Sequence, residues 1–345
     1  MISQQIEGSA LPLLFCKVWF NASAELYKVE QIDLLWYKEW GWNNPGRLHP
    51  HLLICPLPAF SDDRKPTAVS LVQSPDDIVT NYLPLHLFTL DSRPGREDSS
   101  IAVCVKPLSF PDTDISFLLA EWIQLQFALG ADRIVIYKFS VNPATENILE
   151  EFTNKYQNRF QVVPTSLPGN LPNLPRSRNN WLKANINKKR QNEILMLNDC
   201  FLRNINTARY VTLVDIDEVI VPKQGSWLDL LQTLEILNAL DSPDAFCFQH
   251  FYFFKPKNIS SPFFTVYNRS DLSTPGEFSK CFHKVEKVET VHNHLPFTCL
   301  THPDKKDCFV DFTDPVLAKL HHYRAFAILC CARMPRKIPK QREGN

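Results

Sequence analysis

Two aspartates separated by one residue stand directly after a strongly apolar stretch of this sequence. Asp215 and Asp217 follow the largely apolar residues 210–214 in the segment YVTLVDIDEVIVPK. Such a stretch predicts a strand buried in a sheet, and in open α/β sheets ligands bind beyond the carboxyl ends of the strands. Residues two apart point the same way on an extended chain. The pattern therefore predicts two carboxylates aimed together at a ligand site.

Two carboxylates with open positions between them suit a hard divalent cation, Mn²⁺ or Mg²⁺, that completes its shell with phosphate oxygens. Such a cation acts as a Lewis acid and neutralises a departing diphosphate. The chain has nine glycines and neither a GxGxxG nor a GxxxxGK[ST] pattern. A nucleotide would therefore be bound without a dinucleotide fingerprint or a P-loop.

Two other interpretations fit the DID motif. Acidic residues are common where a strand turns into solvent, and an isolated DxD usually means no more than that. The sequence DIDEV also fits the DxDx[TV] nucleophile motif of haloacid-dehalogenase-type phosphatases. That motif normally lies on the first strand of its domain, whereas three predicted strands precede it here, and the later acidic residues 303–307 follow no apolar strand. We therefore favour the metal site.

The elements that must position this motif alternate from residue 101 onward. The periodicity predicts strands at 101–106, 133–139, 160–163 and 210–214, with helices at 115–129, 143–156 and 187–203 between them. A helix at 227–237 and a strand at 245–251 follow. Strands and helices joined by short links imply parallel strands in an α/β layer fold.

The first part of the chain has a different pattern. Short apolar stretches at 52–58 and 82–88 are cut by prolines, and the turn-forming residues 91–98 follow. We expect a β-rich or irregular, stem-like leader over residues 1–98, an α/β domain over 99–324 and a separate basic tail over 325–345.

Five segments in register resemble glycosyltransferase family 92. They are residues 103–137, 191–203, 211–222, 280–296 and 320–324, and CKVWF (16–20) and ICPLP (54–58) resemble its leader. The resemblance covers about residues 14–324. It implies a GT-A fold, with a mixed, mostly parallel central sheet and helices on both faces. It also implies a divalent cation, a UDP-sugar donor that is usually UDP-galactose, and inverting β-galactosyl transfer to a glycan acceptor.

The resemblance has two departures. Family members usually begin with a membrane anchor, which holds them at the Golgi and secretory-pathway lumen. The longest apolar run here, residues 325–332, is far short of the ~18 residues that a spanning helix needs. Any membrane association would need an anchor missing from this chain. The tail at 325–345 does not match the family, so we expect a splice form or a truncated gene product. A transferase-like binding protein that has lost activity is the alternative function, although the intact DID argues against it.

The metal shell needs a third ligand. His322, in LHHYR, lies about a hundred residues after the DID motif, where GT-A enzymes commonly place that ligand, and a neutral imidazole can fill the position. His292, in VETVHNHLP, is the competing candidate.

Asp199 and Arg203 are four apart on the helix predicted before the DID strand. Such a pair can simply support a helix, but the resemblance makes both residues candidates for the donor pocket, together with Asp215. The basic residues between 176 and 190 are interpreted as a solvated face rather than a diphosphate contact.

An inverting transfer needs a carboxylate that takes the proton of the acceptor hydroxyl. Four acidic residues downstream of the motif are candidates: Glu277, Asp271, Asp304 and Asp311. We prefer Glu277, because it precedes the predicted strand KCFHKV in a loop that could reach an acceptor.

The amino-acid composition limits the classes of partner and the cellular compartments that fit this chain. Lys and Arg together number 37, as do Asp and Glu, so the basic surplus typical of nucleic-acid binders is missing. The ten cysteines include no CxxC pair, which argues against zinc. They suit disulfides in an oxidising compartment, with buried thiols in a cytosolic protein as the alternative. Three glycosylation acceptors, at Asn21, Asn258 and Asn268, support secretion only weakly.

Overall fold

The computed structural model describes most of the chain. The described residues are 2–4, 12–20, 23–36, 48–58, 65–85, 100–255, 264, 268–269, 273–301 and 308–325. Several predictions lie outside them: the turn at 91–98, the acceptors Asn21 and Asn258, the base candidates Asp271 and Asp304, and the tail after residue 325.

The body of the protein is a seven-stranded sheet with strand order β10-β9-β8-β11-β16-β13-β19. The strands are β8 (Ile101–Phe110), β9 (Arg133–Val141), β10 (Phe160–Pro164), β11 (Tyr210–Leu213), β13 (Ala245–Phe248), β16 (Lys280–Lys284) and β19 (Val310–Phe312). Strands β10, β9, β8 and β11 run parallel, while β16 is antiparallel to both β11 and β13. The sheet is mixed and mostly parallel, as predicted.

The strand order reverses between β8 and β11. From β8 the chain adds β9 and then β10 on one side, and it returns to place β11 on the other side. A reversal of this kind opens a crevice beyond the carboxyl ends of the two central strands, where open α/β sheets bind ligands. Lys106, on β8, and Asp215, just after β11, lie at this point.

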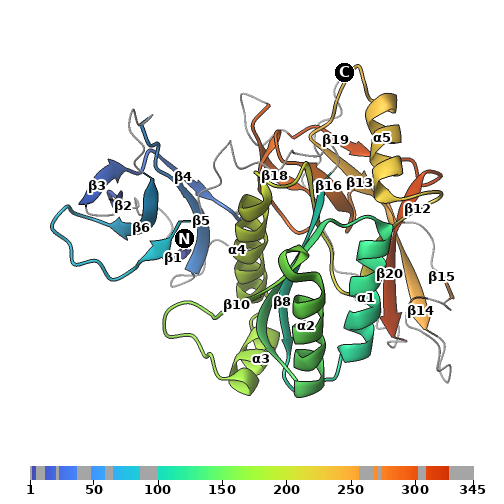
Figure 1. Cartoon of the computed structure of the whole chain (residues 1–345), viewed down its shortest axis with the longest axis horizontal. Coiled ribbons are helices and arrows are strands. Elements are labelled where there is room, and N and C mark those ends of the chain that lie inside the picture. The colour runs from blue at the N-terminus through green and yellow to red at the C-terminus, as the bar shows by residue number, and fades with distance from the viewer. Residues whose placement is uncertain are drawn as a thin grey trace.

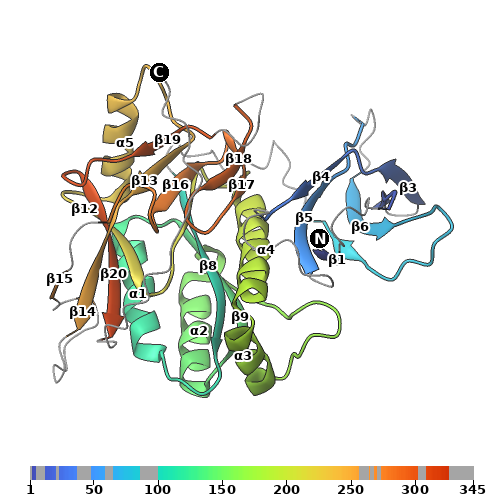
Figure 2. The same cartoon turned by 180° about the vertical axis from the view of Figure 1, so that it is seen from behind.

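Helices cover both faces of the sheet (Figures 1 and 2). They are α1 (Ser116–Leu129), α2 (Pro143–Tyr156), α3 (Pro175–Ala184), α4 (Ile186–Asn204) and α5 (Trp227–Leu237). Alternate residues of each strand face opposite sides. Val103 therefore joins the core under α1, α2 and α5, whereas Cys104 joins the core under α4. The predicted helices are confirmed, and α3 is an addition.

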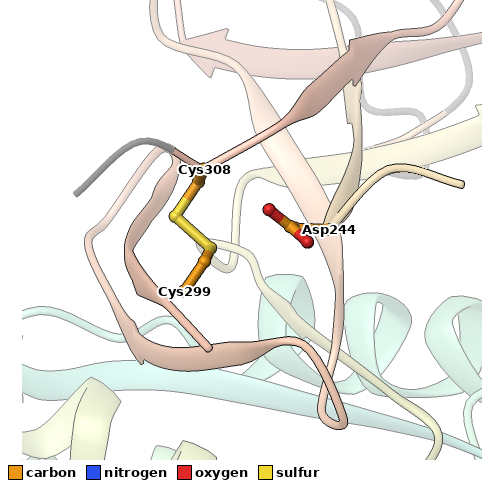
Figure 3. A group of neighbouring side chains, drawn as sticks. All are labelled: Asp244, Cys299 and Cys308. Carbon is orange, nitrogen blue, oxygen red and sulfur yellow. A yellow bond between two sulfur atoms is a disulfide. The ribbon is translucent and has the colours of Figure 1, made fainter. Parts of the chain in front are cut away.

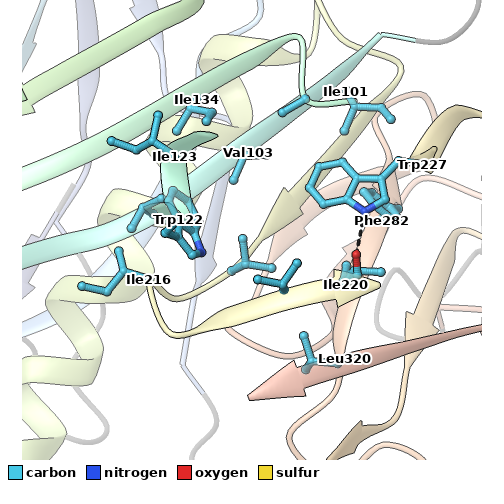
Figure 4. Close-up of a cluster of buried hydrophobic side chains, with 14 of the residues drawn as sticks. Ile101, Val103, Trp122, Ile123, Ile134, Ile216, Ile220, Trp227, Phe282 and Leu320 are labelled. Atoms are coloured by element: carbon cyan, nitrogen blue, oxygen red, sulfur yellow. Dashed lines mark hydrogen bonds between the residues drawn. The ribbon is translucent and has the colours of Figure 1, made fainter. Parts of the chain in front are cut away.

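A second sheet packs beside the first, with strand order β12-β20-β14-β15. Its strands are β12 (Glu218–Pro222), β14 (His250–Lys255), β15 (Asn268–Arg269) and β20 (Ala318–Ala325). The single strand predicted at 245–251 is thus divided between the two sheets. Strand β12 is anchored by two buried indoles. Trp122 Nε1 donates to the carbonyl of Glu218 at 2.9 Å. Trp227 Nε1 donates to the carbonyl of Ile220 at 2.7 Å, as Figure 4 shows.

The N-terminal part forms two small sheets, β1-β5-β4 and β3-β2-β6-β7. Their strands are β1 (Ile2–Gln4), β2 (Phe15–Phe20), β3 (Ser23–Lys28), β4 (Gln31–Leu34), β5 (Leu48–Ile54), β6 (Pro66–Val72) and β7 (Leu83–Pro84). Trp36 packs with Ile194 of α4 in a shared buried cluster, and His49 Nδ1 lies 3.1 Å from Gln191 Nε2 of the same helix. This part therefore contacts the α/β body through α4.

Four disulfides link the described residues. They join Cys16 to Cys55, Cys104 to Cys200, Cys247 to Cys281, and Cys299 to Cys308. The second ties the central strand β8 to α4, so it holds this helix against the sheet. Among the described residues, none of the helices has the length and apolar character needed to cross a membrane.

Histidine burial should make stability fall in acid. His283, on β16, is 1% exposed, and burial together with the charge of Lys280 lowers its pKa to about 3. In the unfolded chain its pKa is near 6.5. Below that pH the histidine is protonated in the unfolded state but stays neutral in the folded state. The contribution of the buried His283 to the free energy of unfolding is fully present above pH 6.5 and is lost as the pH falls toward 3. Between about pH 7.5 and about pH 5.5 the loss is about 1.4 kcal/mol.

Urea unfolding at these two pH values measures the effect. His283→Gln does not titrate, so its unfolding free energy should decline with pH by about 1.4 kcal/mol less than that of the wild type. The same decline in both proteins would contradict the neutral burial of His283.

Candidate functional site

The DID motif lies in a tight turn between the two sheets. Strand β11 ends at Leu213 and β12 begins at Glu218, and the amide of Glu218 donates to the carbonyl of Asp215 at 2.9 Å. The extended geometry predicted for the two aspartates was therefore wrong. The chain has to turn here because it leaves one sheet and enters the other. The Glu218 carboxylate folds back and accepts the amide of Asp215 at 3.1 Å.

Asp215 faces two lysines. Its Oδ2 lies 2.9 Å from Nζ of Lys106 and 3.7 Å from Nζ of Lys280, and the Asp215 side chain is 22% exposed. Burial alone would raise the pKa of Asp215, but the two ammonium groups outweigh it and hold that pKa well below its usual range. Asp215 is therefore ionised across the physiological range, as is Lys106, whose own pKa the aspartate raises against the effect of burial.

Lys280 and Glu218 form the buried floor of the site. The Lys280 side chain is 1% exposed, and its Nζ lies 3.3 Å from Oε2 of Glu218. The same Nζ donates to the backbone carbonyl and the side-chain oxygen of Asn293 at 3.1 and 3.0 Å. Burial raises the pKa of Glu218; the Lys280 charge opposes this rise and the Asp215 charge adds to it. The floor is a fixed network, because each member is held by a partner on another element.

Asp217 and His322 come together through strand pairing. Strand β20 runs antiparallel to β12 with His322 opposite Glu218, and the amide of Tyr323 donates to the carbonyl of Asp217 at 2.7 Å. This register places Nε2 of His322 3.3 Å from Oδ2 of Asp217. A residue about a hundred positions later in the chain thus lies beside the motif, as the sequence predicted.

The His322 ring lies among charged groups on both of its nitrogens. Arg324 Nε donates to its Nε2 at 3.1 Å, so the guanidinium occupies the lone pair of this nitrogen and a cation would have to displace it. The other nitrogen, Nδ1, lies 3.4 Å from Oε1 of the buried Glu218. Histidines that bind metals commonly present one nitrogen to the cation and turn the other toward a carboxylate that fixes the ring. Tyr252, on the neighbouring β14, packs against the ring with its centroid 5.0 Å away.

Glu277 lies on the His322 side of the site. Its backbone carbonyl is 3.2 Å from Nδ1 of His250, and the His250 ring centroid is 6.3 Å from that of His322. The Glu277 carboxylate itself accepts a hydrogen bond from Thr274 Oγ1 at 2.8 Å. Asp311 lies instead on strand β19, opposite Phe246 of β13.

Other partners hold the remaining predicted residues. Asp199 accepts hydrogen bonds from Tyr137 and, at 2.7 Å, from Arg203 Nε, so the pair supports α4 and ties it to β9. His292 is 9% exposed and packs near the Phe297 ring, and burial followed by the Lys280 charge lowers its pKa to about 3.

The basic stretch is only partly a solvated face. Arg176 is exposed and pairs with Asp112 at 2.9 Å, as expected of such a face. Arg178 is 4% exposed, and its guanidinium lies over the Phe139 ring at 4.9 Å. This arginine departs from the prediction because α3 turns it inward against β9.

The described residues contain one group of three metal-ligating side chains whose ligand atoms all lie within 4.8 Å of one another: Asp244, Cys299 and Cys308. Its two cysteines form a disulfide (Figure 3). The carboxylate of Asp244 accepts hydrogen bonds from Thr301 Oγ1 and the Phe309 amide, both at 2.8 Å. The group therefore has a structural role: its disulfide and its hydrogen bonds hold the neighbouring segments together. The DID carboxylates and His322 do not form a second group within this distance, since Asp215 is turned toward Lys106.

Sequence reasoning missed Lys106, Glu218 and Lys280. One signal was present for Lys106: it is a lone charge at the end of the apolar run IAVCV, at the same sheet edge as the motif. Glu218 follows the motif directly, but an acidic residue at this position is also typical of a turn exposed to solvent. Lys280 carried no signal, because its role depends on the antiparallel pairing of β16 with β11.

The model of glycosyltransferase family 92 matches residues 99–342. The chain belongs to glycosyltransferase family 92. The matched region includes the whole central sheet, the DID turn and strand β20, so the site described above is part of the family's domain. The match also runs to residue 342, so most of the tail expected to depart from the family lies inside it. Membership makes the protein a glycosyltransferase by family, which in general implies a sugar donor and an acceptor.

Other comparisons add little. Two crystal structures of S. aureus TarS, one of residues 1–349, share 16% identity with 47% of this chain, at TM-scores of 0.25 and 0.26. The chain spans 37% and 23% of those two chains, and similarity at this level carries no argument. None of the curated proteins compared with this chain matches it.

Proposed function

We propose that this family 92 protein is a metal-dependent glycosyltransferase that moves galactose from UDP-galactose to a glycan acceptor with inversion. The observation that carries the proposal is the meeting of Asp217 and His322, 3.3 Å apart, beside the point where the strand order reverses. A carboxylate and an imidazole at this spacing fit one divalent cation.

The residues that would hold Mn²⁺ or Mg²⁺ are Asp215 and Asp217, with His322 as the third ligand. The Glu218 carboxylate, 3.4 Å from Nδ1 of His322, supports this assignment, because metal-binding histidines commonly turn their second nitrogen toward a carboxylate. When bound, the cation supplies Lewis-acid stabilisation of the departing diphosphate.

Glu277 is our proposal for the base that accepts the proton of the acceptor hydroxyl. Its loop contacts His250, which borders His322, whereas Asp311 belongs to a strand on the outer edge of the main sheet. Asp199 and Arg203 we assign to holding α4 against β9 rather than to the donor pocket.

We further propose that the protein works in the lumen of the Golgi or secretory pathway. Four disulfides among the described residues suit an oxidising compartment.

A second candidate is a transferase-like protein that binds a glycan or a partner without turnover. One observation favours it: Asp215 pairs with Lys106 and Lys280 rather than gathering with Asp217 and His322. In this alternative the lysines replace the cation permanently. The phosphatase interpretation of the DID motif has no support from the family match.

A donor screen separates the two functions. The purified chain with Mn²⁺ is given UDP-galactose, UDP-glucose and UDP-N-acetylglucosamine, each with a panel of glycan acceptors, and UDP release is followed. We expect release from UDP-galactose to exceed release from the other donors. Calorimetric binding of a donor without turnover on any acceptor would favour the inactive binding protein.

A further inference from the structure

Lys106 is an unusual residue for the position it holds. It ends the apolar run of β8, the central strand next to the strand-order reversal, where every preceding residue of the strand is buried. Its side chain is 22% exposed, unlike the buried residues before it. Its Nζ pairs with Oδ2 of Asp215 at 2.9 Å.

Lys280 stands directly behind this pair. Its Nζ lies 3.7 Å from the same Asp215 oxygen, but its side chain is only 1% exposed. The carbonyl and amide oxygens of Asn293 hold the ammonium in place. Lys280 therefore fixes a positive charge in the interior, while Lys106 carries one on a partly exposed side chain.

Two ammonium groups converging on one carboxylate oxygen make a strong site for an anion when that carboxylate is engaged elsewhere. Removing charges from water is costly, and an ion pair alone is weak evidence for a purely stabilising role. Lysine is a common partner of phosphate groups, because its ammonium acts as a compact point charge. The location matters as well, since the crevice at a strand-order reversal is where α/β sheets bind nucleotides.

We propose that Lys106, backed by Lys280, is the contact for the donor's diphosphate, and that Asp215 occupies this contact until the anion arrives. The inference rests on the proposed function, whose donor is a nucleoside diphosphate sugar. Lys106 touches the anion; Lys280 is a positioning residue that strengthens the local positive field. Asp215 holds the Lys106 ammonium in place while no donor is bound.

The account makes a prediction that a structural ion pair does not make. In the absence of any divalent cation, Asp215→Asn should bind anions more tightly than the wild type, because the competing carboxylate charge is gone. With EDTA and at low ionic strength, we expect inorganic pyrophosphate and UDP to bind about tenfold more tightly to Asp215→Asn, by calorimetry.

The gain should depend on Lys106. Lys106→Met should lose measurable pyrophosphate binding, and the double variant Asp215→Asn/Lys106→Met should show no gain over the wild type. The double variant removes both members of the pair and leaves no uncompensated charge, so it tests the account even if Lys106→Met fails to fold. Lys138→Met is the matched control, because Lys138 pairs with Glu146 of α2 rather than with the motif; its affinity should equal that of the wild type.

Three results would overturn the inference. One is an Asp215→Asn protein with unchanged pyrophosphate affinity, and another is a gain that persists in the double variant. Orthophosphate binding as tight as pyrophosphate binding would also refute the diphosphate assignment. The proposed function fails separately: a wild type that binds pyrophosphate through Lys106 but turns over no UDP-sugar with Mn²⁺ would retain this anion site and lose the transferase assignment.

Discussion

Asp217→Asn should lower kcat for sugar transfer by on the order of 10²-fold, as when a single electrostatic stabiliser is removed from an active site. The substitution keeps the size of the side chain and removes the charge that faces His322 at 3.3 Å. If that charge holds the cation that stabilises departing UDP, the substitution removes this stabilisation from the transition state. UDP release at saturating donor, with Mn²⁺ in excess, measures the effect.

The fold should tolerate this substitution. The Asp217 side chain is 33% exposed, and the hydrogen bond that joins this residue to β20 uses its backbone carbonyl. Thermal unfolding should therefore change little. Asp241→Asn is a matched control, because Asp241 lies after α5, between that helix and the start of β13. An Asp217→Asn protein that turns over donor at the normal rate would refute the role of this carboxylate.

Replacement of His322 should have a different signature. His322→Ala removes one ligand of several, so the Mn²⁺ concentration needed for half-maximal activity should rise by roughly 10–100-fold. The rate at saturating Mn²⁺ should fall less than it does in Asp217→Asn. His322→Gln keeps more of the volume beside Tyr252 and serves if the alanine variant is unstable. A Mn²⁺ titration of UDP release gives both quantities.

His292→Ala provides the comparison for this experiment. The His292 ring is 9% exposed beside Phe297, so its loss should lower stability and leave the Mn²⁺ requirement unchanged. If His322→Ala instead unfolds with unchanged metal dependence while His292→Ala raises the requirement, the third-ligand role belongs to His292.

The local pattern of the α/β body could be predicted from its sequence for a physical reason. Asn142 accepts the amide of Thr145 and so begins α2, and Gly130 takes the left-handed conformation, with φ of 118°, that ends α1. Both signals act within a few residues, so a single sequence displays them. Helix α3 was missed because its start, at Pro175, follows a polar, proline-rich stretch without helical periodicity.

The site itself was predicted only in part, because its geometry depends on pairings between distant strands. Asp215 and Asp217 were recognised from the strand before them, but not the turn they form, since β12 enters a second sheet. Lys106 and Lys280 reach Asp215 because β8 and β16 flank β11 on its two sides. The disulfide partners of the cysteines could not be predicted from the sequence either, because the four pairings depend on the finished fold.

The central claim is that this site transfers a sugar from a nucleotide donor with the help of a divalent cation. The most direct measurement is UDP release from UDP-galactose by the metal-depleted chain, before and after Mn²⁺ is added back, with a glycan acceptor present. The account predicts negligible release in EDTA, recovery with Mn²⁺, and no recovery in Asp217→Asn. Full release in EDTA, or equal recovery in wild type and Asp217→Asn, would contradict it.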